Sequence, residues 1–410
     1  MVGEHGCLSW IQSIIAAAAI DRALLCASRL LPQAAVPAGR AARGGLGQIF
    51  RHSIGRTEIA IACALALSIL AANAKADRLE LVAGGGAKVE GPAAECKLTE
   101  PFACGKDSKG TLYIAEMAGR VLAVDPSGRL RRVAGGKGEG SAGDNGPARD
   151  SQLNAPHNLL VLPGGDVLVA DTMNHRVRKI IAKSGRIVPF AGTGAAGFGG
   201  DGGPALAATF GAIYCLALDA RRDALYLDDL DNHRIRKIDL KTGMVTTVAG
   251  NGQRGVPKDG SIAIEAPLQD PRAIACDSKG NLYILERSGN ALRVVDTGGR
   301  IKTVVGTGKA GPAEDSPALA ATLRGPKHLI ADHDDNILIA DTDNHMIRKF
   351  VVAESRIVRV CGTGAAGADG IGAAPETAHL NLPHGVYVDS RGTIYICDSW
   401  NGRVLRIVRE

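Results

Sequence analysis

The chain contains six copies of one pattern of segments, and the element missing from the last copy stands ahead of the first. In a typical copy, two apolar segments joined by a turn are followed by an Asn-containing turn and an Arg-rich third segment. Five copies add a fourth segment that ends in Gly, at residues 131–135, 187–192, 245–250, 301–306 and 357–362. The sixth copy stops at Glu410 without one, while residues 79–84 form an unattached fourth segment. We therefore predict that residues 79–84 pair beside residues 404–408 and close the repeats into a ring.

The most regular marker of the repeat is the acid that ends the second segment. It recurs every 55 to 58 residues, at Glu116, Asp171, Asp229, Glu286, Asp341 and Asp398. Four short apolar segments per unit, separated by turn residues, are typical of a four-stranded antiparallel sheet. Radial repetition of such sheets lets a β-fold grow without enlarging one core. The sequence predicts an all-β fold, a six-bladed β-propeller of four-stranded antiparallel blades over residues 77–410, in which the N-terminal strand completes the last blade.

Three of the turns carry nearly the same residues, DTMNHRVR at 171–178, DLDNHRIR at 229–236 and DTDNHMIR at 341–348. These segments resemble NHL repeats, whose family forms six-bladed β-propellers, and the resemblance covers roughly residues 78–410. The first and fourth copies depart from the pattern at residues 116–119 and 286–290. Asp and Asn side chains commonly bond nearby backbone N–H groups in turns. We therefore expect His175, His233 and His345 to be turn residues and the following Arg to pair with an Asp.

Residues 51–76 have the features of a signal peptide. An uncharged apolar run of 14 residues, 59–72, follows Arg51 and Arg56 and precedes Ala74-Lys75-Ala76, which fits an A-x-A cleavage site. Cleavage after Ala76 would leave the predicted first strand almost at the mature N-terminus. We expect an exported protein, periplasmic or extracellular, with residues 1–50 as an unstructured leader upstream of the true start. An uncleaved short membrane anchor is the alternative.

Charge and glycine spacing exclude two classes of partner. Residues 1–76 hold seven Lys and Arg and three Asp and Glu, so they carry four of the net +6 charges. The rest of the chain has no basic tract, which argues against a nucleic-acid partner. The G-x-G-x-x-G pattern starts at residues 192, 250, 306 and 362, at a fixed place in a β-repeat. A nucleotide fingerprint opens one helix of a βαβ unit instead, so nucleotide binding is excluded as well.

The Gly-rich loops that follow each contain one Asp. These residues are Asp144, Asp201, Asp259, Asp315 and Asp369. One carboxylate per loop falls short of the six to eight oxygens that calcium takes, so we expect turn stabilisation and one helical turn after each. Six cysteines lie in the body, at positions 96, 104, 215, 276, 361 and 397, without a CxxC spacing. Zinc-knuckle and dithiol chemistry are therefore disfavoured, and no disulfide is assigned.

An up-and-down meander would place the start of each first segment, the Asn-His turn and the Gly/Asp loop on one face, beside the central channel. The residues that begin the first segments are therefore predicted to ring the channel mouth and to bind the ligand. They are Phe102, His157, Tyr214, Arg272, Lys327, His328 and His384. Tyr214 is placed by alignment through Asp219, because its copy lacks the Pro that starts the others. No cofactor is firmly implied, and zinc or calcium are the divalent ions considered.

The three histidines of this set suggest a metal site, because imidazole is a common zinc ligand. The arrangement is similar to that of the peptide-amidating lyases related to NHL proteins, whose zinc is held by channel histidines at strand starts. Pro156-His157 and Pro383-His384 match that local pattern, whereas Lys327-His328 is offset by one residue. The resemblance implies His157, His328 and His384 as metal ligands. The alternative is that Pro-His is simply how this repeat enters its first strand.

The predicted function is that of a monomeric, ligand- or protein-binding scaffold that uses its loop-rich face to bind a protein, peptide or carbohydrate. The alternative is a propeller enzyme, a metal-dependent lyase or lactone hydrolase, that uses the channel residues. The sequence contains no G-x-S-x-G elbow and no identifiable acid pair, so no catalytic residue is assigned and a non-enzyme is favoured. Sugar-lactone hydrolases and strictosidine synthase-like proteins share the six-bladed architecture, but a shared fold does not carry function.

Overall fold

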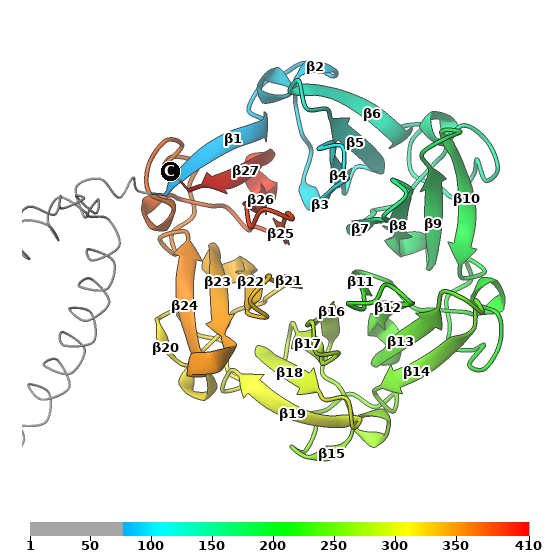
Figure 1. Ribbon diagram of the computed structural model, residues 1–410, viewed down its shortest axis with the longest axis vertical. Coiled ribbons are helices and arrows are strands. Elements are labelled where there is room, and N and C mark those ends of the chain that lie inside the picture. The colour runs from blue at the N-terminus through cyan, green and yellow to red at the C-terminus, as the bar shows by residue number, and fades with distance from the viewer. Residues whose placement is uncertain (1–76, 410) are drawn as a thin grey trace, which may run out of the picture. The chain divides into compact units, whose positions relative to one another are not determined.

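The computed structural model describes residues 77–409, which form six antiparallel sheets arranged around a ring (Figure 1). The predicted leader, residues 1–50, and the predicted signal peptide, residues 51–76, lie outside the described residues. In the part of the chain that is described, no helix is long and apolar enough to cross a membrane. The all-β, six-bladed architecture predicted from the repeats is confirmed.

Each blade is a meander of four strands, numbered here from the centre outward. Blade 1 contains β3 (Pro101–Lys106), β4 (Leu112–Glu116), β5 (Arg120–Val124) and β6 (Arg129–Gly135), and blade 2 contains β7 (Asn158–Val161), β8 (Val167–Asp171), β9 (Arg176–Ile181) and β10 (Arg186–Ala191). Blade 3 contains β11 (Leu216–Leu218), β12 (Ala224–Asp229), β13 (Arg234–Asp239) and β14 (Val245–Ala249), and blade 4 contains β16 (Pro271–Cys276), β17 (Leu282–Glu286), β18 (Ala291–Val295) and β19 (Arg300–Val305). Blade 5 contains β21 (His328–Ala331), β22 (Ile337–Asp341), β23 (Met346–Val351) and β24 (Arg356–Cys361), and blade 6 contains β25 (Gly385–Val388), β26 (Ile394–Asp398), β27 (Arg403–Val408) and β1 (Arg78–Gly84).

Three blades carry a short fifth strand that the sequence did not predict. The two-residue strands β2 (Gly91–Pro92), β15 (Ser261–Ile262) and β20 (Ser316–Pro317) pair outside β6, β19 and β24. Each of them hydrogen-bonds part of the outer edge of its sheet, so that part of the edge is not left unpaired. The first strands β3, β7, β11, β16, β21 and β25 lie nearest the centre of the ring (Figure 1).

The ring is closed as the sequence predicts, because β1 from the start of the described chain pairs antiparallel with β27 from its end (Figure 1). Leu79 lies opposite Ile407 and Gly84 opposite Arg403. The Leu79 side chain is fully buried, and its backbone also bonds the loop of residues 372–373, at 2.7 and 2.9 Å. Gly84 has a φ of +94°, and a Cβ there would collide with the carbonyl oxygen of Gly402. That close approach explains why fourth segments end in Gly.

The repeated Asp–Asn–His–Arg turns are structural, as predicted. In blade 2 the Asp171 carboxylate accepts the backbone N–H of Asn154 at 2.8 Å and the side-chain amide of Asn174 at 2.9 Å. Arg178 is fully buried and lies 3.7 Å from the same carboxylate. His175 ends the turn in the left-handed conformation, with φ +52°. His233 and His345 occupy the same position, with φ of +50° and +53°. Through its bond to the Asn154 N–H, the Asp171 carboxylate connects the end of the second strand to the loop that leads into the first strand.

The Asp residues of the Gly-rich loops stabilise the loops by bonding the third and fourth strands. Asp144 lies 2.6 Å from Arg178, and Asp201 lies 2.8 Å from Arg236. Asp259 accepts the Thr303 N–H at 2.7 Å. The apolar stretch after each loop begins with one 3₁₀ turn, with bounds Ala93–Glu95, Ala148–Asp150, Ala205–Ala207, Ala263–Glu265, Ala318–Ala320 and Pro375–Thr377. Both features agree with the prediction that these Asp residues stabilise turns and that one helical turn follows each loop.

Candidate functional site

All six blades contribute a side chain to one ring at the predicted mouth of the central channel, and neighbouring members are in contact except between Arg272 of blade 4 and Lys327 of blade 5. Phe102 of blade 1 stacks on His384 of blade 6 at 4.1 Å between ring centroids, and its other neighbour, His157 of blade 2, is 4.7 Å away. His157 meets the ring of Tyr214 edge-on at 4.6 Å, and the Arg272 guanidinium lies 3.7 Å from the Tyr214 centroid. The structure therefore brings together the first-strand residues that the sequence singled out.

Lys327 and Trp400 complete the ring. The Lys327 ammonium of blade 5 lies 6.0 Å from the centroid of Trp400, and the Trp400 ring stacks on His384 at 5.1 Å with an interplanar angle of 12°. Trp400 lies in the 3₁₀ turn Ser399–Asn401, after the second strand of blade 6. Phe102, His157, Arg272 and His384 are buried, whereas Trp400 is 47% exposed. Trp400 is thus the solvent-facing member of the ring.

His157 and His384 are held in matching orientations. Nδ1 of His157 lies 2.7 Å from the carbonyl oxygen of Ala155, and Nδ1 of His384 lies 3.0 Å from that of Leu382. A carbonyl accepts but cannot donate, so each Nδ1 carries the proton and each Nε2 keeps a lone pair. Burial, with the positive charges of Arg272 and Lys327, places the pKa of both imidazoles well below the usual value. Both histidines are therefore neutral at pH 7.

His328 lies away from this ring and joins opposite sides of the channel. It starts β21 of blade 5, and its Nε2 lies 2.9 Å from the side-chain amide of Asn158 at the start of β7 in blade 2. The backbone N–H of Val386 points to its Nδ1 at 3.4 Å. The side chain is half-buried by exposed area, yet the surrounding protein and the Arg272 charge lower its pKa to about 4. The one-residue offset seen in the sequence thus moves His328 to a hydrogen-bonded bridge across the channel.

The predicted metal ligand set is not formed. Within residues 77–409 no group of three or more His, Cys, Asp or Glu side chains is placed to hold a metal ion. Both ring nitrogens of His328 face hydrogen-bond partners. The Phe102 ring lies between His157 and His384, in van der Waals contact distance of both. The described residues therefore do not form the predicted set, and His157, His328 and His384 as metal ligands stay an unconfirmed prediction.

Arg272 and Asp228 are buried groups with unsatisfied polar atoms. The Arg272 side chain is 4% exposed and its Nε has no hydrogen-bond partner in the described residues. Asp228 is fully buried; its Oδ1 accepts the backbone N–H groups of Tyr214 and Cys215, at 2.8 and 2.7 Å, while its Oδ2 has no partner. Burial lowers the pKa of Arg272 to about 10, so the guanidinium remains charged, and burial raises the pKa of Asp228 well above its usual value. Buried atoms without partners are rare in folded proteins, and two of the eight found in the described residues belong to Arg272 and Asp228.

The electrostatic potential at the channel mouth is positive. Burial lowers the pKa of Lys327; the Asp343 carboxylate opposes this shift, and the charges of Arg272 and Arg287 add to it. Arg272 also lowers the pKa of His157, His328 and His384. Histidines from three blades are therefore affected by the same positive charge, which disfavours a bound cation and favours an anion.

The outer rim of the mouth divides into an apolar arc and a charged arc. In every blade one residue after the second strand donates its backbone N–H to the loop that precedes the first strand. These residues are Met117, Met173, Leu230, Arg287, Asp343 and Trp400, from blades 1 to 6 in order. Met117, Met173 and Trp400 are each 38–47% exposed and belong to three neighbouring blades, whereas blades 4 and 5 carry the charged residues. Sequence reasoning missed this position, because it lies one residue after the marker acid in blades 1, 3 and 4 and two residues after it in blades 2, 5 and 6.

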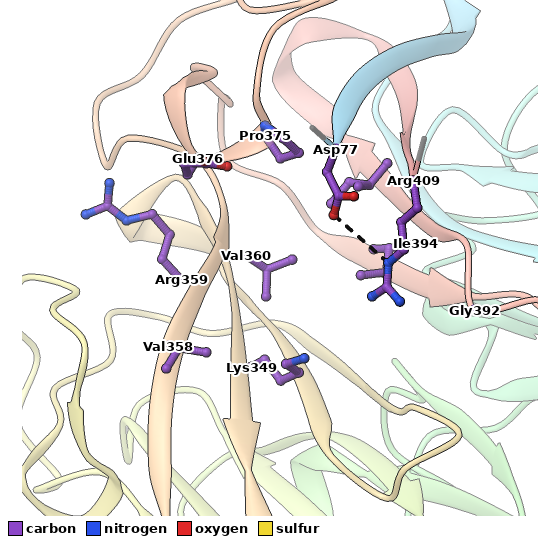
Figure 2. Close-up of a pocket in the computed structure, with 11 residues that line it drawn as sticks. Asp77, Lys349, Val358, Arg359, Val360, Pro375, Glu376, Gly392, Ile394 and Arg409 are labelled. Atoms are coloured by element: carbon purple, nitrogen blue, oxygen red, sulfur yellow. Dashed lines mark ion pairs between the residues drawn. The ribbon is translucent and has the colours of Figure 1, made fainter. Parts of the chain in front are cut away.

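A separate surface recess lies at the seam between blades 5 and 6 (Figure 2). It has a volume of about 240 Å³ and is lined by parts of β23, β24 and β26 together with Asp77 and Arg409. The Asp77 carboxylate and the Arg409 guanidinium form an exposed ion pair at 4.0 Å, drawn as a dashed line in Figure 2. None of its lining residues carries a buried polar atom without a partner. The recess is therefore a gap beside the closure, and the channel mouth is the better candidate site.

The buried histidines predict a pH dependence of stability. An unfolded histidine has a pKa near 6.5, and the folded pKa of His384 is well below it, so the unfolded state binds more protons as the pH falls. Between pH 6 and 5 the free energy of unfolding should therefore fall by about 1.4 kcal/mol per pH unit more in the parent than in His384→Gln. Denaturant unfolding at both pH values measures this difference. Parallel pH curves for the two proteins would contradict it.

Comparison with known proteins agrees with the repeat pattern. The sequence profile of the NHL repeat matches residues 153–180 and 380–407, and that of the teneurin NHL domain matches residues 204–318. The chain therefore carries NHL repeats, which confirms the resemblance seen in the sequence. The profile matches fall on blades 2 and 6 and on the region from the loop before blade 3 to the loop before blade 5.

The curated proteins with similar sequences are longer than this chain. Protein SUPPRESSOR OF QUENCHING 1, chloroplastic, of Arabidopsis thaliana is 26% identical over 65% of this chain and 26% of its own length. NHL repeat-containing protein 2 of Bos taurus is 24% identical over 70% of this chain and 43% of its own length. The chain therefore spans less than half of these relatives. An auxiliary nutrient binding protein from Bacteroides thetaiotaomicron has a similar fold, with a TM-score of 0.61 and 15% identity over 82% of this chain and 77% of that one.

Proposed function

We propose that this NHL-repeat protein binds a small ligand at the mouth of its central channel, on the face that carries the Asn-His turns. The observation that carries the proposal is a buried, charged Arg272 whose Nε lacks a partner, next to an aromatic ring that ends in the exposed Trp400. Leaving a buried donor unpaired costs about 1–3 kcal/mol, a cost that a bound acceptor would remove. His328 and Asn158 join blades 5 and 2 beneath these groups through one hydrogen bond between their side chains.

Two further points support a binding role. The side chains of the ring are fixed by mutual stacking, which gives a ligand a preformed surface and reduces the entropy lost on binding. The structure of similar fold from Bacteroides thetaiotaomicron is that of an auxiliary nutrient binding protein, and a binding role of that kind suits this chain. The proposal includes export to the periplasm or beyond, from the signal-peptide features of residues 51–76; sequencing of the secreted protein should then give Asp77 as its first residue.

Tryptophan fluorescence tests binding at the mouth. The chain has two tryptophans, Trp10 and Trp400, so the full chain carrying Trp10→Phe reports from the mouth alone. A set of small acids, amines, sugars and neutral aromatic compounds is screened by ligand-observed NMR. We expect the compounds that bind to change the Trp400 emission and to lose at least about 10-fold in affinity in Trp400→Ala, which corresponds to one aromatic contact of about 1.4 kcal/mol. Binders that leave the emission unchanged would place the site elsewhere.

A second candidate function is catalysis at the same mouth. The observation that favours it is the pair of neutral imidazoles with free Nε2 lone pairs, because a neutral imidazole can take a proton from a bound substrate. The two functions differ in the fate of the bound ligand. A binding protein should release each ligand chemically unchanged, whereas an enzyme should convert it to product and lose that turnover in His157→Gln and His384→Gln.

A further inference from the structure

We infer that the ligand of the channel mouth is a monoanionic carboxylate joined to a flat apolar group. The inference rests on the function proposed above and names the chemical class of its ligand. It follows from the unpaired positive charge of Arg272 at the mouth and from the apolar side chains on the opposite side of the rim.

The carboxylate partner is Arg272. Its guanidinium face lies over Tyr214 at 3.7 Å, which leaves the in-plane N–H groups free to donate. Among residues 77–409 no carboxylate oxygen lies within 4.0 Å of this guanidinium, and Nε has no acceptor. Arginine binds carboxylates through two parallel N–H···O bonds, which here would use the vacant Nε and its neighbouring Nη.

The charge balance of the mouth selects a monoanion. Lys327 lies 3.7 Å from the Asp343 carboxylate, and Arg287 lies 3.7 Å from that of Asp270, so both cations have partners. The two nearest histidines are neutral. The Asp228 carboxylate is the nearby acid that acts most strongly on Arg272, but it lies beyond ion-pair distance and burial raises its pKa well above the usual value. Arg272 is therefore the cation of the described ring that makes no ion pair. A carboxylate brings one negative charge and two acceptor oxygens. A phosphate monoester brings close to two charges and would leave the second one unmatched in a buried position.

The apolar part of the ligand fits the opposite arc of the rim. Arg272 belongs to blade 4, and the exposed Trp400, Met117 and Met173 belong to blades 6, 1 and 2, across the mouth. His384 stacks on one face of the Trp400 indole at 5.1 Å and leaves about half of its side chain exposed. A flat ring gains both area burial and stacking on such a surface, and methionine adapts to the edges of an aromatic group.

Calorimetry on the full chain with three related probes tests the inference. The probes are 3-phenylpropanoate, its neutral amide 3-phenylpropanamide, and propanoate, which lacks the ring. We expect 3-phenylpropanoate to bind at least 10-fold more tightly than either of the others. Arg272→Met should remove that 10-fold advantage over the amide, and Trp400→Ala should weaken both aromatic probes alike. The control is Arg391→Met, an exposed arginine in the turn between β25 and β26 at the other end of blade 6, which should change nothing. A fourth probe, phenyl phosphate, should bind no more tightly than the amide.

The outcomes separate the inference from the proposed function. If the amide binds as tightly as the acid and Arg272→Met has no effect, or if phenyl phosphate is preferred, the monoanion inference is overturned. The broader proposal would survive that result, because it depends only on binders that change the Trp400 emission. If none of the probes binds at 10 mM while other compounds of the screen do, the ligand class is wrong and the site is retained. Circular dichroism and thermal unfolding of Arg272→Met show whether the variant is folded. Arg272→Lys provides a second test, because lysine keeps the positive charge but lacks the two parallel N–H donors of the guanidinium.

Discussion

Replacing Leu79 by Asp is expected to destabilise the whole propeller by about 5 kcal/mol and to lower its melting temperature by on the order of 10 °C. Leu79 is fully buried in the core between blades 5 and 6, opposite Ile407 of the last strand. The substitution removes a large apolar side chain and puts an unpaired charge in its place. Because β1 covers the outer edge of β27, its release also exposes the hydrogen-bonding groups of that strand. Calorimetry or denaturant unfolding of the full chain measures the loss.

Val89→Asp is the matched control for this prediction. Val89 lies ten residues further along, is 74% exposed, and receives the same new charge without loss of buried area. Its stability should stay within about 0.5 kcal/mol of the parent. If the two Asp variants were equally stable, β1 would not hold the last blade to the first, and the closure seen in Figure 1 would not matter for folding.

The ring closure could be predicted from sequence because it depends on a count of strands. Six acids at regular spacing give six blades, and a fourth segment ahead of the first blade has one open place to pair. The residues at the starts of the first strands were likewise found from the repeat, and Tyr214 was found without its Pro. The two-residue strands β2, β15 and β20 were missed because two residues, here Gly-Pro, Ser-Ile and Ser-Pro, are too short to show an alternating pattern.

The candidate site was less predictable, since it depends on directions that a repeat pattern does not give. The sequence predicts that three histidines lie at the mouth. It does not predict that the Phe102 ring contacts both His157 and His384, or that His328 bonds Asn158 across the channel. Asp228 was overlooked because it precedes the marker acid Asp229 and looks like part of the same turn. The rim position of Trp400 appears only when residues with the same backbone hydrogen bond are compared between blades.

Replacing Arg236 by Met is expected to cost about 3–5 kcal/mol of unfolding free energy. The Arg236 side chain is fully buried; its Nη1 lies 3.2 Å from the Asp229 carboxylate and its Nη2 lies 2.8 Å from that of Asp201. Methionine fills much of the same volume but leaves the buried Asp229 charge without its cation. The burial that already raises the pKa of Asp229 then acts without an opposing arginine. Equilibrium unfolding at pH 7 measures the cost.

A second substitution separates the charge from the packing. In Arg236→Met/Asp229→Asn the amide oxygen can still accept the Gly211 N–H, which Asp229 Oδ1 accepts at 2.7 Å, but no buried charge remains. We expect the double variant to recover at least about 1 kcal/mol relative to Arg236→Met, because an unpaired buried charge costs more than a neutral polar group. Arg406→Met is the control: this arginine pairs with Glu80 at 2.7 Å in a half-exposed position, so its loss should cost under about 1 kcal/mol. Equal losses for Arg236→Met and Arg406→Met would mean that the repeated Asp–Arg pair, the most regular feature of this sequence, contributes no more to stability than a surface ion pair.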